Sequence, residues 1–162
     1  MNRTIRHLLT PRWLARRGLR KADVAAIARA VAVANLSHRG ELRLMAEGPL
    51  SPGRLLRRQT PKERAFELYS GLAASAPGGV GDVLVYVQLV DRRAEIVPSP
   101  AVAEKVGQDH WDAIAREMEV ACRAGAYRRG ILDAIERISR LLDIHFPARK
   151  SVSDVPERPV LI

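Results

Sequence analysis

The chain has 162 residues, of which 47% are hydrophobic and 28% are charged, and its formal net charge is +9. This length corresponds to one domain, and the apolar content argues against an intrinsically disordered chain. The single cysteine excludes an intrachain disulfide and a metal site built on several thiolates.

The positive charge is concentrated in two short segments. Residues 1–22 hold seven basic residues and no acidic one, and residues 54–64 hold five basic residues and one acidic residue. A nucleic-acid-binding face normally spreads Lys and Arg over the domain and adds aromatic stacking residues. Nucleic acid is therefore not the expected partner, and an acidic protein partner or an anionic membrane surface is expected instead.

The first segment, residues 1–20, is expected to be a basic leader. It has apolar residues at helix-like spacing up to Trp13, interrupted at Thr10 and Pro11. Two interpretations remain open: an amphipathic segment that touches an anionic surface, or a short helix that packs Trp13 and Leu14 on the domain. The apolar stretches are too short for a secretory signal or a membrane span. We therefore expect a cytoplasmic protein that can associate peripherally with the inner membrane.

A helix and then a strand follow the leader. An apolar period of 3.6 in residues 21–37 predicts an amphipathic helix. The period changes to two in residues 41–47, which predicts a strand with Leu42, Leu44 and Ala46 on its buried face.

A basic loop over residues 48–59 leads to a helix with a strong start signal. Thr60 and Glu63 have the spacing of a capping box, with proline at the first helical position, so a helix is predicted over 61–74. Its expected buried residues are Ala65, Phe66, Leu68, Tyr69 and Leu72.

A hairpin is predicted next. The almost continuous apolar run of residues 83–90 is typical of a central strand covered on both faces. Residues 91–93 read as a turn into a second strand at 94–97. The glycines within 78–81 lead into a strand and not into a helix, so they indicate a connector and not a phosphate-binding loop.

Three helices are predicted to close the domain. Ser99 can cap a short helix that ends near residue 105, and Asp109 can cap a longer one over 110–124. Cys122 falls on the apolar face of that longer helix, which predicts a buried, unreactive thiol.

The last helix is expected over residues 126–145, and residues 147–162 are expected to form an extended tail. The element order predicts an α/β domain over residues 21–146, in which helices cover a small mixed sheet.

One place in the sequence gathers an imidazole and carboxylates. His110 lies between Asp109 and Asp112, and Asp82 or Asp91 can be added from the ends of the strand. Such oxygen and nitrogen donors suit a divalent ion such as calcium or magnesium. Aspartate is also common at the start of a helix, because it accepts hydrogen bonds from the free backbone N–H groups and interacts favourably with the helix dipole. The spacing alone therefore does not specify a metal site.

Several segments resemble the TPM domain family. The hairpin carries the resemblance, through the sequence GDVLVYV at residues 81–87 and DRRAEIV at residues 91–97. Further segments similar to the family pattern are residues 38–43, 63–69, 108–114, 118–126 and 156–162. The resemblance covers about residues 20–146 and the tail.

The resemblance implies a three-layer α/β/α sandwich around a small mixed β-sheet with a β-hairpin. Some plant members of the family are described as acid phosphatases, some members bind calcium or other divalent metals, and others act as accessory proteins at membranes. The chain is similar to short bacterial members. It departs from the pattern where Gly81-Asp82 replaces Asn-Gly, where residues 74–78 replace a tryptophan-glycine element, and at Gln108, near a usual aspartate.

These observations favour a non-enzymatic accessory module that binds an acidic partner, such as a membrane-anchored TPM relative, or an anionic membrane surface. The expected contact residues are Arg3, Arg6, Arg12, Trp13, Arg16, Arg17, Arg54, Arg57 and Arg58. The alternative is a phosphatase that depends on calcium or magnesium. Its expected metal ligands are Asp82, Asp91, Asp109 and His110.

Overall fold

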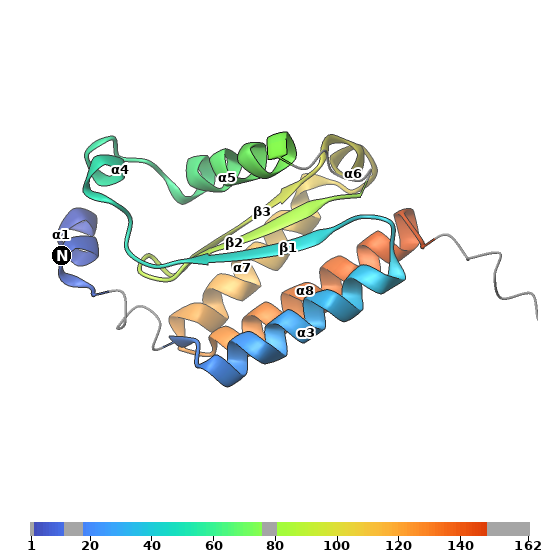
Figure 1. The fold of residues 1–162 in the computed structure, drawn as a ribbon, viewed down its shortest axis with the longest axis horizontal. Helices are drawn as coiled ribbons and strands as arrows, with labels where there is room; N and C mark the ends of the chain where they lie inside the picture. Colours follow the sequence, from blue (N-terminus) through green and yellow to red (C-terminus); the bar gives the residue numbers. More distant parts are fainter. Residues whose placement is uncertain (1, 12–17, 76–80, 149–162) are drawn as a thin grey trace, which may run out of the picture.

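The computed structural model describes residues 2–11, 18–75 and 81–148, and Figure 1 shows their arrangement. The helices are α1 (Arg3–Leu9), α3 (Lys21–Ser37), α4 (Pro52–Leu56), α5 (Pro61–Ser75), α6 (Pro100–Lys105), α7 (Gln108–Arg123) and α8 (Tyr127–His145). The strands are β1 (Leu42–Glu47), β2 (Val83–Gln88) and β3 (Arg93–Pro98).

The three strands form one mixed sheet in the order β1-β2-β3. β1 runs parallel to β2, with Leu42 opposite Val83, and β2 runs antiparallel to β3, with Val83 opposite Pro98. All six residues of β2 are buried. The predicted central strand and hairpin are therefore present.

Helices cover both faces of this sheet. α5 lies over one face, while α3, α7 and α8 lie under the other (Figure 1). Because side chains alternate along a strand, Val83, Val85 and Val87 of β2 pack toward the three-helix side, whereas Leu84 and Tyr86 pack toward α5. The chain is thus the α/β/α sandwich that the sequence predicted.

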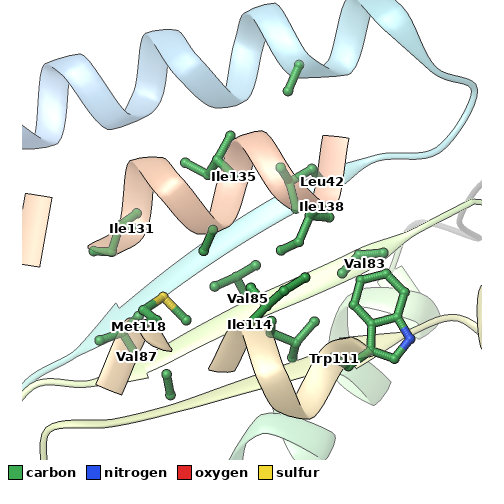
Figure 2. Close-up of a cluster of buried hydrophobic side chains, with 14 of the residues drawn as sticks. Leu42, Val83, Val85, Val87, Trp111, Ile114, Met118, Ile131, Ile135 and Ile138 are labelled. Atoms are coloured by element: carbon green, nitrogen blue, oxygen red, sulfur yellow. The ribbon is translucent and has the colours of Figure 1, made fainter. Parts of the chain in front are cut away.

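The larger core lies between the sheet and the pair α7 and α8. Figure 2 shows Trp111, Ile114 and Met118 of α7 meeting side chains of α8 and the valines of β2. The helix-spaced apolar residues of α8 in this core are Ile131, Ile135 and Ile138. Burial of each such side chain contributes about 1.5–3 kcal/mol, so this layer is the main source of stability.

Local signals place α5, but its rotation differs from the prediction. Thr60 and Glu63 form the capping box, with Glu63 N donating to Thr60 Oγ1 at 3.2 Å and Thr60 N donating to Glu63 Oε2 at 2.8 Å. Ala65 is fully buried, whereas Phe66 is 50% exposed. The predicted burial of Phe66 is wrong because the stripe that meets the sheet runs through Ala65 and Leu68.

Three further details differ from the prediction. Ala46 is exposed, because β1 is an edge strand that the helices cover incompletely. The basic loop contains the short helix α4. Gly107 is the N-cap of α7, so Asp109 lies inside its first turn and does not cap it.

Candidate functional site

The proposed metal ligands do not converge. Asp82 directly precedes β2 and Asp91 follows its other end, so the six-residue strand, which rises about 3.3 Å per residue, separates them. Asp82 Oδ1 accepts a hydrogen bond from Glu41 N at 2.9 Å. Asp109 and His110 are neighbours on α7, and the Asp109 side chain is 84% exposed.

No group of three His, Cys, Asp or Glu side chains in residues 2–11, 18–75 and 81–148 could hold a metal ion. The donor set therefore does not fit the divalent metal that the family resemblance implies. Of the four predicted ligands, the structure brings only Asp109 and His110 together, with 3.9 Å between Oδ2 and Nδ1.

Asp91 instead binds the leader. Its carboxylate, 4% exposed, lies 2.8 Å from Arg3 Nε, 2.6 Å from Arg6 Nη2 and 3.0 Å from His7 Nε2. Burial by itself raises the pKa of Asp91, but the hydrogen bonds from Arg3 and Arg6, with the His7 ring close by, outweigh it and hold the pKa below its ordinary value. Asp91 is therefore ionised at neutral pH and already accepts hydrogen bonds from two guanidinium groups, with the His7 ring beside it.

His7 fixes the position of α1 on the domain. Its buried ring accepts a hydrogen bond at Nδ1 from Leu50 N at 3.0 Å. A neutral imidazole that accepts at Nδ1 carries its proton on Nε2, the atom that faces Asp91. Arg3 Nη1 adds a hydrogen bond to Gln59 O at 2.7 Å.

These contacts bring the two basic segments of the sequence to one end of the molecule (Figure 1). We call this the arginine end, and it consists of α1, residues 50–60 and the turn between β2 and β3. Sequence reasoning did not find the contact between the leader and Asp91, because its partners lie far apart in the chain. The one signal in the sequence for this contact was Asp91, an aspartate in the predicted hairpin turn directly before Arg92 and Arg93.

The remaining predicted contact residues fall into three groups. Arg54 is engaged, donating to Gln59 Oε1 at 3.0 Å and to Glu67 Oε2 at 2.6 Å. Arg57 and Arg58 are exposed and form no ion pair within the described part of the chain. The residues that lie outside the described ranges are Arg12, Trp13, Arg16 and Arg17.

A second buried carboxylate, that of Glu119, lies at the start of β3. Glu119 Oε2 is 3.0 Å from Arg93 Nη1 and 3.0 Å from Arg123 Nη2, and Oε1 accepts from Ala94 N at 3.2 Å. Glu119 therefore fastens α7 to the start of β3.

A pocket of about 290 Å³ lies at the opposite end, where β1 and β2 begin. It contains Glu41, Arg43, Tyr69 and Asp82. Burial, with the nearby Asp82 charge adding to it, raises the pKa of Tyr69. Arg43 pairs with Glu41 and also lies close to Asp82 and Tyr69. This pocket thus has partly compensated charges, in contrast to the arginine end.

The fold and these surfaces define a small α/β/α module with an arginine-rich end. The TPM domain family model matches residues 18–141, so the chain belongs to the TPM domain family. A similar solved structure is the NMR structure of the BA42 protein from the psychrophilic bacterium Bizionia argentinensis. Its TM-score is 0.68 at 24% identity, over 87% of this chain and 91% of that chain. No curated protein matches the sequence.

Proposed function

We propose that the protein is a non-enzymatic accessory module that binds an anionic membrane surface through its arginine end. The observation that carries the proposal is the meeting of the leader and the 50–60 segment, which gathers cations and apolar side chains on two contacting elements. The proposed location is the cytoplasmic side of the inner membrane, at its periphery. Among the described helices, none could span a bilayer.

The apolar part of this surface favours a membrane over a soluble acidic partner. The large apolar side chains exposed here are Ile5, Leu8, Leu9 and Leu56. Aliphatic groups on short surface helices suit insertion among lipid headgroups, and arginines beside them pair with lipid phosphates. Arg57 and Arg58 are available for this because no carboxylate in the described residues neutralises them.

The test is sedimentation with lipid vesicles. Wild-type protein is expected to bind vesicles containing phosphatidylglycerol and not vesicles of phosphatidylcholine alone, with binding that weakens as salt rises. Each arginine near an anionic surface contributes about 1 kcal/mol, so Arg57→Gln with Arg58→Gln should weaken binding at least about tenfold. Leu8→Ser with Leu9→Ser should also weaken it.

The matched control is Arg137→Gln with Arg140→Gln, which removes the same charge from α8. Control binding should fall much less. If both double variants lose the same affinity, only net charge matters and the proposal fails. If no vesicle binds but an acidic, membrane-anchored TPM relative does, the occupant is that protein and the membrane proposal is wrong.

A further inference from the structure

Two buried carboxylates organise a cluster of arginines at the hairpin turn of the arginine end. Asp91 and Glu119, 4% and 9% exposed, each bind two guanidinium groups, and one more arginine lies in the turn. The five arginines are Arg3, Arg6, Arg92, Arg93 and Arg123. Five cations against two carboxylates leave a net charge of +3.

Part of this cluster lines a cavity. The cavity has a volume of about 850 Å³ and lies between α1, the β2–β3 turn and the junction of α7 with α8. Arg6, Arg92 and Arg123 line it from these three places, together with Asp91 and Tyr127. Its size falls in the range of small-molecule sites, and its cations outnumber its single carboxylate.

The arginines keep hydrogen-bond donors for a ligand. A guanidinium group has five N–H donors. Arg92 donates to Arg123 O at 3.3 Å, and Arg123 donates to Glu119 Oε2 at 3.0 Å. Arg92 and Arg123 therefore keep further N–H donors of the kind that bind oxyanions in pairs.

The β2–β3 turn sets the backbone of Arg92. Its φ of 53° lies in the left-handed region, where glycine, asparagine or aspartate costs less. From this turn the Arg92 side chain reaches the end of α7 beside Tyr127.

We infer that this cavity binds the phosphate group of an anionic phosphate ester. Three guanidinium groups match a tetrahedral oxyanion of one or two negative charges, and the volume leaves room for a glycerol-sized ester group. The inference rests on the proposed function in that a phospholipid headgroup is one source of the phosphate. A soluble phosphate ester is the other source, with the same chemistry.

The test uses sn-glycerol 3-phosphate as the probe, titrated into ¹⁵N-labelled full-length protein at constant ionic strength and pH. Amides of residues 91–93 and 123–127 should shift and saturate. Arg92→Gln should weaken the fitted Kd about tenfold, as expected when a charged hydrogen-bond donor is lost. Arg123→Lys, which keeps the charge but not the planar fork, should weaken it less. Arg140→Gln, an equal charge change on α8, should leave it unchanged.

Vesicles then separate the two sources. If Arg92→Gln weakens both glycerol phosphate binding and phosphatidylglycerol vesicle binding, the ligand is the lipid headgroup. If it weakens only the former, the ligand is a soluble ester. Absence of saturable shifts, or equal affinity in wild type and a folded Arg92→Gln protein, overturns the inference. The proposed function still stands in that case if Arg57→Gln with Arg58→Gln reduces vesicle binding.

Discussion

His7 Nε2 lies 3.0 Å from the buried carboxylate of Asp91, and this contact joins the first helix to the hairpin turn. The His7 side chain is fully buried, and its other ring nitrogen accepts the Leu50 amide. A protonated ring could not accept that hydrogen bond. The docked leader therefore requires a neutral imidazole and an ionised Asp91, and the placement of the arginine end depends on both.

Asp91→Asn is expected to destabilise the protein by about 3 kcal/mol, the lower part of the range for removing one partner of a buried ion pair. The lower part applies because the partner arginines Arg3 and Arg6 are partly exposed. Urea unfolding followed by circular dichroism measures the change. Asp133→Asn, which removes an exposed partner of Arg129, should cost less than about 0.5 kcal/mol. Equal costs would contradict the role of Asp91.

The pH dependence follows from the lowered pKa of Asp91. A group whose pKa is lower in the folded state than in the unfolded state adds stability above the unfolded value, here 3.8. That contribution is lost as the pH falls through the folded value. The part of the difference in unfolding free energy between wild type and Asp91→Asn that comes from Asp91 ionisation should thus be present above the unfolded value and shrink below about pH 4. A difference that grows on acidification would contradict this assignment.

Gly40 and Gly81 hold β1 and the start of β2 in close backbone contact. A Cβ on Gly40 would lie 1.8 Å from Gly81 O, so Gly40→Ala must displace backbone. We expect a loss of about 3 kcal/mol or more, at or beyond the upper end of overpacking costs. Gly53→Ala is the control, since no atom lies within 4 Å of its Cβ position and alanine favours helix. Thermal unfolding of both variants should show a lower Tm for the first and an equal or higher Tm for the second.

Local sequence signals predicted most of the fold. The Thr60 and Glu63 capping box, the Ser99 cap and the apolar run of β2 each act over a few residues, and each is present in the structure. The exposure of Phe66 could not be predicted because adjacent helix positions differ by about 100°, and the packing of α5 decides which one meets the sheet.

The candidate site was harder to predict than the fold. Local pattern grouped Asp91 with Asp109 and His110 as metal ligands, whereas the structure pairs it with Arg3 and Arg6. Sequence spacing carries no information on which cation approaches a buried carboxylate across the fold. Arg3 and Arg6 of the basic leader thus attach α1 to the domain. In the described part of the chain, Arg57 and Arg58 of the second basic segment are among the arginines that face the solvent.

Calcium and magnesium provide a direct test of the finding that the predicted metal ligands do not converge. A ligand that binds only the folded state must raise the Tm. Because the predicted ligands do not converge, millimolar CaCl₂ or MgCl₂ should shift the Tm no more than NaCl of equal ionic strength. A saturable rise above that control, abolished by Asp82→Asn, would show that the Glu41 and Asp82 pocket holds a metal.

Cys122 is expected to be unreactive in the native protein. Its side chain is fully buried, and burial, reinforced by the Glu119 charge, raises the pKa of the thiol to about 11. At pH 8 only about one thiol in a thousand is then ionised, and the thiolate is the reactive form. Ellman's reagent should label the native protein far more slowly than the urea-unfolded protein. Ala28→Cys places a second thiol on the exposed side of α3, and this variant should react quickly at one site and slowly at the other. Rapid labelling of the native wild type would show that α7 opens readily and that the core around Cys122 is less closed than its burial indicates.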